Sequence, residues 1–232
     1  MCALTLYHGS EHIVRKPEYD LGSPYNDYGQ GFYCTLDFDL ACEWACKGGR
    51  DGIVNSYSLD TEGLRALDML DGKHSILNWI AILLTHRTFS LTNEIAIDAR
   101  DYLIEHFGID TSLFDIVVGY RADDSYFSFA EAFVENGIPL RKLDEALRLG
   151  KLGEQYVLTS PAGINRLEFV EAVPAEGSLY FPRFKSRDEL ARSLWRDRVR
   201  PGRTWKDDIF IVDIMREEMD NDDPRILRAL SE

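Results

Sequence analysis

The chain lacks several features that would place it in a specialised class of protein. No apolar run of about 18 residues occurs in it, which excludes a membrane-spanning helix and leads us to expect no contact with a membrane. The N-terminus has no basic region followed by an apolar stretch, so we expect no secretory signal. Cysteine is scarce, and the four residues form no disulfide framework. These absences predict a cytoplasmic protein with reduced thiols.

Motifs for metal sites and for common hydrolases are also missing. Cys42 and Cys46 share one expected helix, but no second pair of His or Cys follows at a plausible distance, so we predict no metal site. No Ser-His-Asp arrangement or metalloprotease motif occurs. The pair Gly29 and Gly31 is too short and wrongly placed for a Rossmann fingerprint or a phosphate loop.

Positive charge is in deficit. The chain holds 26 Lys and Arg against 40 Asp and Glu, which gives a formal net charge of −14. An acidic surface repels phosphate backbones, so non-specific nucleic-acid binding is disfavoured. Apolar residues make up 45% of the chain, enough for a globular core.

Hydrophobic periodicity predicts an α+β fold. The expected strands are residues 3–7, 32–35, 53–59, 114–120, 155–159 and 166–172, and the expected helices are residues 39–47, 75–87, 93–107, 127–136 and 140–149. We expect the last two strands to form a closing pair. A main domain would span residues 1–174, with a helical insertion at about 64–112, and residues 175–232 would form a helical appendage.

The expected appendage carries charge of opposite sign in neighbouring segments. Residues 183–206 are basic, residues 216–223 are acidic, and the apolar run Ile209–Val212 lies between them. The favoured interpretation is that these charges pair within the chain. The alternative is that the appendage docks a protein partner or packs near a cleft, because the apolar run needs something to bury it.

Two blocks near the N-terminus have the residue types of a ligand pocket. His8 ends a short apolar strand, where its ring can grip a sugar hydroxyl, and Gly9 lets a ligand approach the backbone. In the second block Gly29 and Gly31 precede Tyr33, which offers a flat face for stacking. The alternative is that His8 is structural and that the aromatic residues pack in the core.

Two further segments place polar residues at strand ends. Glu154 and Gln155 open an apolar strand and face opposite sides if that strand is regular, so at most one faces a pocket unless a bulge intervenes. Asp123 and Asp124 follow another strand, where a polar loop is the favoured interpretation and a site role is the alternative.

The order of these blocks resembles the ADP-ribosyltransferase superfamily, in the His-Tyr-Glu branch that includes poly(ADP-ribose) polymerases and diphtheria toxin. His8-Gly9-Ser10 matches the first motif, Gly29 to Tyr33 the second, and Gln155-Tyr156 is nearest to the Glu-Tyr of the third. The pattern also looks like an uncharacterised bacterial family of that superfamily, some of whose members are encoded beside small proteins as toxin–antitoxin pairs. The resemblance covers residues 3–172.

The resemblance implies two small, mostly antiparallel sheets around a cleft for NAD, with NAD as a substrate and no metal. His8 would bond the adenosine ribose, Gly9 would hold the nicotinamide carboxamide, and Tyr33 would stack on the nicotinamide ring. Ser10, Gly31 and Thr35 complete the expected NAD-binding set. The implied activity is transfer of ADP-ribose to a macromolecule, with a protein favoured as acceptor and a small antitoxin-like protein as a partner.

The sequence departs from that pattern at the catalytic Glu, where Gln155 offers a hydrogen bond but no charge. Four interpretations stay open. Glu154 reaches the site through a bulge, Asp123 or Asp124 substitutes for the acid, an acidic group on the target assists, or catalysis is lost and binding survives. The rival functions are an NAD glycohydrolase and a catalytically inactive NAD or ADP-ribose-binding module. A third is a modifier of small molecules or nucleic acids, which the net charge disfavours.

Overall fold

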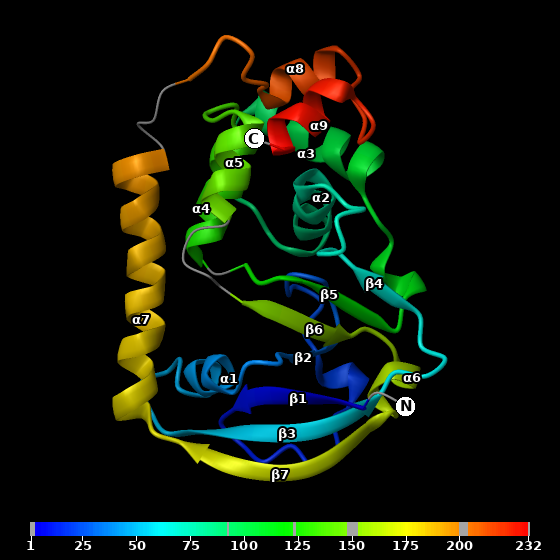
Figure 1. The fold of residues 1–232 in the computed structure, drawn as a ribbon, viewed down its shortest axis with the longest axis vertical. Coiled ribbons are helices and arrows are strands. Elements are labelled where there is room, and N and C mark those ends of the chain that lie inside the picture. Colours follow the sequence, from blue (N-terminus) through cyan, green and yellow to red (C-terminus); the bar gives the residue numbers. More distant parts are fainter. Residues whose placement is uncertain (1–2, 92, 123, 148–152, 200–203, 232) are drawn as a thin grey trace. The chain divides into compact units, whose positions relative to one another are not determined.

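The structure is a computed structural model that describes residues 3–91, 93–122, 124–147, 153–199 and 204–231. It has strands and helices in mixed order along the chain (Figure 1). The strands are β1 (Ala3–Ser10), β2 (Phe32–Cys34), β3 (Gly52–Asp60), β4 (Ala66–Asp68), β5 (Ile116–Tyr120), β6 (Glu154–Leu158) and β7 (Leu167–Ala175). The α-helices are α1 (Phe38–Ala45), α2 (Ile76–His86), α3 (Glu94–Phe107), α4 (Asp124–Val134), α5 (Leu140–Leu147), α6 (Pro161–Ile164), α7 (Gly177–Leu194), α8 (Ile211–Arg216) and α9 (Pro224–Ser231).

The strands form two small sheets. One has the order β1-β3-β7 and the other the order β2-β6-β5-β4, and every pairing is antiparallel except that of β4 with β5. The prediction of an α+β fold with two small, mostly antiparallel sheets is confirmed. The prediction that the last two strands pair is wrong, because β6 lies between β2 and β5 while β7 pairs with β3. Strand β4 also falls where a helical insertion was expected.

A backbone bridge joins the two sheets of the first unit. Tyr7 of β1 and Thr35, just after β2, form an isolated antiparallel bridge in which each backbone N–H donates to the other's carbonyl, at 2.8 and 2.9 Å. The space between the sheets is filled by apolar side chains from both of them. These are Leu6, Tyr57 and Leu59 from the first sheet and Phe32, Cys34, Ile116, Val118 and Leu158 from the second, together with Ile164.

Helix α1 packs against the β1-β3-β7 sheet through small residues (Figure 1). Ala41, Cys42, Ala45 and Cys46 are buried against Val54 and Ala175. Their short side chains let the helix approach β1 so closely that a Cβ on Gly9 would lie 2.1 Å from the carbonyl oxygen of Ala41. Gly9 is therefore required by packing, since no other residue leaves room for the helix backbone.

Contacts divide the chain into two compact units. The first consists of Met1–Leu70, Asp110–Arg121 and Gly153–Arg187 and holds both sheets, and the second consists of Asp71–Ile109, Ala122–Leu152 and Asp188–Glu232. The division does not follow a boundary near residue 174. Within the second unit, Ile209 and Ile211 are buried, and the carbonyl of Ile209 accepts from the N–H of Leu140 at 2.8 Å. The apolar run is thus covered by the unit to which it belongs.

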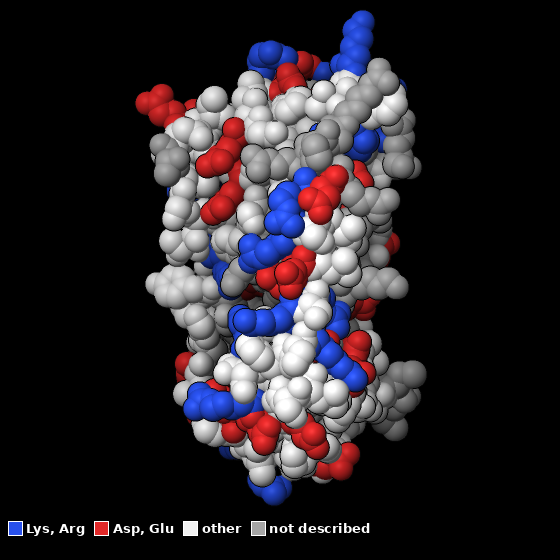
Figure 2. Space-filling model, turned by 90° about the vertical axis from the view of Figure 1, so that its left-hand side faces the viewer, with Lys and Arg blue, Asp and Glu red and all other residues white. Residues whose placement is uncertain are grey.

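The charged segments of the tail form ion pairs with other residues of the chain. In the first unit, Arg187 of α7 binds the buried Glu43 of α1 with both ends of its guanidinium, at 2.7 and 3.0 Å. The acidic segment pairs with arginines beside it, as Glu217 and Asp223 both bind Arg225. Basic and acidic side chains alternate on the side of the molecule that carries α7 (Figure 2). Among the described residues, therefore, the basic segment (183–206) and the acidic segment (216–223) form ion pairs with other residues and not with each other.

Replacing Ile211 by Ala tests whether the C-terminal segment is part of the second unit's core. The Ile211 side chain is fully buried, so the substitution should lower the free energy of unfolding by about 2–5 kcal/mol. Leu227→Ala is the matched control, because that side chain is 54% exposed and its loss should cost less than about 0.5 kcal/mol. Urea denaturation followed by circular dichroism measures both. Equal, small effects would show that the segment contributes nothing to the core.

Candidate functional site

The sequence motifs converge on the junction of the two sheets in the first unit. The Nδ1 atom of His8 lies 2.7 Å from the backbone carbonyl oxygen of Tyr33, so the first and second motifs are in direct contact. Tyr33 pairs with Val157 of β6, two residues from Gln155 and on the same face of that sheet. The expected residues of all three motifs therefore belong to one region of the fold.

His8 has a defined tautomer. A carbonyl oxygen can only accept, so Nδ1 must carry the proton, and in the neutral ring Nε2 is an acceptor. Burial lowers the pKa of His8 below its ordinary value of 6.5, although the hydrogen bond to Tyr33 acts in the opposite direction. The ring also packs on Phe32, with ring centroids 4.3 Å apart. The neutral imidazole is thus held rigidly with an acceptor nitrogen.

Tyr33 is half-buried and anchors the turn that precedes it. Its hydroxyl donates to the carbonyl of Gly29 at 2.7 Å and accepts from the N–H of Tyr28 at 3.1 Å. Gly29 has a φ of 77°, in the left-handed region that glycine tolerates best. At Gly31 a Cβ would lie 2.8 Å from the carbonyl oxygen of Leu158. Both glycines are accordingly needed to fold the turn onto β6.

Ser10 and Thr35 have structural contacts. The Ser10 hydroxyl accepts from the side-chain amide of Asn55 at 3.1 Å, and that amide also donates to the carbonyl of His12. Thr35 is buried, bridges to Tyr7, and accepts from the N–H of Asp37 at 3.1 Å. Both side chains therefore stabilise the backbone conformation close to their own motifs.

The two residues that open β6 lie on opposite faces of the sheet. The pairing of β5 with β6 runs without interruption from Ile116 opposite Leu158 to Tyr120 opposite Glu154, so no bulge turns Glu154 toward the face of Gln155. Glu154 is exposed, whereas Gln155 is 3% exposed. Asp123 lies outside the described residues. Of Glu154 and Gln155, the two expected catalytic residues that the structure describes, Gln155 shares a face with Tyr33.

Gln155 is held by groups that the sequence had not linked to it. Its Nε2 atom lies 3.1 Å from Oδ2 of Asp27 and 3.1 Å from the carbonyl oxygen of Tyr120. Asp27 is 7% exposed and comes from the turn just before the second motif. The only sequence signal was its position beside the glycine-aromatic block, because the contact spans 128 residues of chain.

Trp44 of α1 contributes a further aromatic side chain close to the first motif. Its Cβ lies beside Gly9, and the guanidinium carbon of Arg121 lies 4.9 Å from the centre of its indole ring. The indole Nε1 is buried, and no hydrogen-bond acceptor contacts it within the described part of the chain. Buried donors are normally satisfied in folded proteins, so an acceptor from a bound molecule is a natural partner for this N–H.

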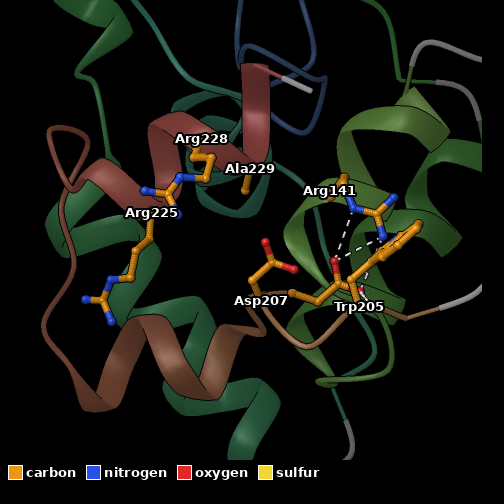
Figure 3. A pocket seen from close by; sticks show the side chains of 7 residues that line it. Arg141, Trp205, Asp207, Arg225, Arg228 and Ala229 are labelled. Carbon is orange, nitrogen blue, oxygen red and sulfur yellow. Dashed lines mark hydrogen bonds and ion pairs between the residues drawn. The ribbon is translucent and has the colours of Figure 1, made fainter.

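A hollow of about 430 Å³ lies within the other unit (Figure 3). It is lined by Arg141, Trp205, Asp207, Asp208, Arg225, Arg228 and Ala229. Arg141 binds Asp208, at 3.1 Å for the closest pair, and Arg225 binds Glu217 and Asp223. The positive charge of these two arginines is therefore largely compensated, and none of the motif residues contributes to this hollow.

The titration of His8 predicts a pH dependence of stability. The pKa of His8 is lower in the folded chain than its ordinary value of 6.5, so the folded state binds fewer protons than the unfolded state. The contribution of neutral His8 to the free energy of unfolding is therefore present above about pH 6.5. It is lost as the pH falls below that value. His8→Gln should flatten the loss of stability between about pH 7 and pH 5. The exposed His12 is the control, since His12→Gln should leave the slope unchanged. Equal slopes in all three proteins would contradict the prediction.

Comparison with known proteins gives a family but no activity. A family model described as "Protein of unknown function (DUF3990)" matches residues 4–169. Searches of curated proteins and of solved structures find no match. The matched segment includes His8, Tyr33 and Gln155 and extends from β1 into β7. The chain therefore belongs to the DUF3990 family of proteins of unknown function.

Proposed function

We propose that this chain binds NAD and transfers its ADP-ribose moiety to a macromolecule, with protein as the favoured acceptor. The observation that carries the proposal is the contact between the motifs. Neutral His8 bonds to the backbone of Tyr33, and Tyr33 shares a sheet face with Gln155. A hydrogen-bond acceptor, an aromatic ring and an amide in one region suit a ligand that contains a ribose and a flat ring.

Further groups at the same place suit the remaining parts of NAD. The Cβ of Trp44 lies beside Gly9, and the buried indole N–H of the same side chain would be satisfied by a carbonyl oxygen such as that of a carboxamide. Arg121 brings a guanidinium to the Trp44 ring, and a guanidinium is a group that can bind a pyrophosphate. The site thus offers donors and positive charge besides the three motif residues.

In the proposed reaction, the bond between the nicotinamide nitrogen and ribose C1′ breaks. Its electron pair leaves with nicotinamide, which becomes neutral, and positive charge develops on the ribose. An acceptor oxygen, nitrogen or sulfur attacks C1′ and gives up its proton. Groups that accept hydrogen bonds from the ribose or stabilise its positive charge accelerate the step. Water in place of the macromolecule would make the same chemistry an NAD glycohydrolase.

The first test measures NAD binding and nicotinamide release by the purified chain. Calorimetry should detect NAD binding, and His8→Ala should weaken it at least several-fold, because the acceptor at Nε2 is lost. His12→Ala is the matched control, since the His12 side chain is exposed and the residue contacts Ser10 and Asn55 through its backbone. Nicotinamide release with labelling of a protein supports the transferase, and release without labelling supports the glycohydrolase. Binding without release supports the inactive module, and absence of binding would overturn the proposal.

Trp44→Phe gives a second test, which separates ligand binding from stability. The variant keeps an aromatic ring and removes the buried N–H, which costs about 1–3 kcal/mol when it is unsatisfied. Without NAD the variant should therefore be no less stable than the wild type. Its affinity for NAD should fall several-fold, because the ligand loses a donor. Thermal unfolding with and without NAD measures both effects, and a variant with unchanged affinity would remove Trp44 from the site.

A further inference from the structure

The carboxylate of Asp27 is positioned against Gln155 by a set of contacts within the first unit. The carbonyl of Tyr120 accepts from the hydroxyl of Tyr28 at 2.9 Å and from Nε2 of Gln155 at 3.1 Å. Tyr28 lies over Gly119, where a Cβ would come within 2.0 Å of the tyrosine hydroxyl. The backbone N–H of Tyr28 is bound to the hydroxyl of Tyr33. Asp27 is therefore fixed by its neighbour in the chain rather than free to swing.

These contacts determine how the Gln155 amide is oriented. Asp27 Oδ2 and the Tyr120 carbonyl are both acceptors, so the atom between them must be the NH₂ group of the amide. The amide oxygen Oε1 is then the remaining polar atom, and no described residue donates a hydrogen bond to it. Gln155 thus presents an acceptor oxygen while its nitrogen is bound to a carboxylate.

We propose that Asp27 and Gln155 act together in place of a single catalytic carboxylate. This proposal rests on the proposed function. Gln155 Oε1 accepts a hydrogen bond from a hydroxyl of the nicotinamide ribose. Asp27 is a positioning residue that holds the amide in this orientation. Its negative charge polarises the amide toward Oε1 and stabilises the positive charge that develops on the ribose as nicotinamide leaves. The chain thereby keeps a negative charge near the site without an acid at position 155.

The proposal gives a role to a carboxylate that is buried against the amide of Gln155. Burial of a charged group is costly unless the group is hydrogen-bonded, and Asp27 is only 7% exposed. It also makes Glu154 and Asp123 unnecessary as sources of charge. The arrangement differs from a Glu at position 155, because orientation and charge come from two side chains on different elements.

An exchange of the two groups tests the proposal. Asp27→Asn keeps an acceptor for the Gln155 amide and removes the charge, so nicotinamide release should fall about 100-fold, while the dissociation constant for NAD changes less than about threefold. Gln155→Glu places a second carboxylate against Asp27. Two such groups share a proton, so this variant should show no gain at neutral pH. The double variant Asp27→Asn with Gln155→Glu restores one charge and one amide and should recover activity to within about tenfold of the wild type.

The control and the opposing outcomes are equally specific. Asp20→Asn changes an exposed carboxylate on the same N-terminal loop and should leave release unchanged. An active wild type with a fully active Asp27→Asn variant would overturn this inference and leave the proposed function in place. A loss in Asp27→Asn that the double variant does not restore would also overturn it, because Asp27 would then be needed only for structure. A wild type that neither binds NAD nor releases nicotinamide would overturn the proposed function itself and this inference with it.

Discussion

The bridge between Tyr7 and Thr35 is the contact on which the arrangement of the first unit depends. Two backbone hydrogen bonds join β1 to the end of β2 and so fix one sheet against the other. Because His8 is next to Tyr7 and Tyr33 is two residues before Thr35, the bridge sets the distance at which the imidazole meets the Tyr33 carbonyl. The apolar core between the sheets then fills the space that the bridge leaves open.

Most polar groups of the candidate site make hydrogen bonds that stabilise the fold, and only a few are available to bind a ligand. The hydroxyl of Tyr33 closes the turn before β2, and Asn55 holds the segment after β1. Against this background three polar atoms stand out: Nε2 of His8, Nε1 of Trp44 and Oε1 of Gln155. The first and third are acceptors and the second is a donor, a combination that fits a molecule with hydroxyl groups and a carbonyl.

Local pattern predicted much of the fold, and long-range contacts account for what it missed. Alternation identified β1, β2 and β3, and helical spacing identified α2 and α3. Strand β4 has three residues and no alternation to reveal it, and the assignment of β6 and β7 to different sheets depends on partners far away in sequence. The tail looked separate because composition changes after Pro174, yet burial of Ile211 and Ile214 depends on tertiary neighbours that composition does not encode. In the site, the order of the sequence motifs predicted His8, Tyr33 and Gln155. The contact between Asp27 and Gln155 became visible only in the structure, once the pairing of the strands was known.

The steric role of the motif glycines has a consequence for reading other sequences of the family. Gly9 and Gly31 are needed because backbone atoms of α1 and β6 occupy the space of a side chain, whether or not a ligand is bound. A relative that had lost all catalysis would still need both glycines to fold. The glycine-aromatic signature therefore indicates architecture, and positions 27 and 155, on which the proposed activity depends, are the better place to look for that activity in a given member.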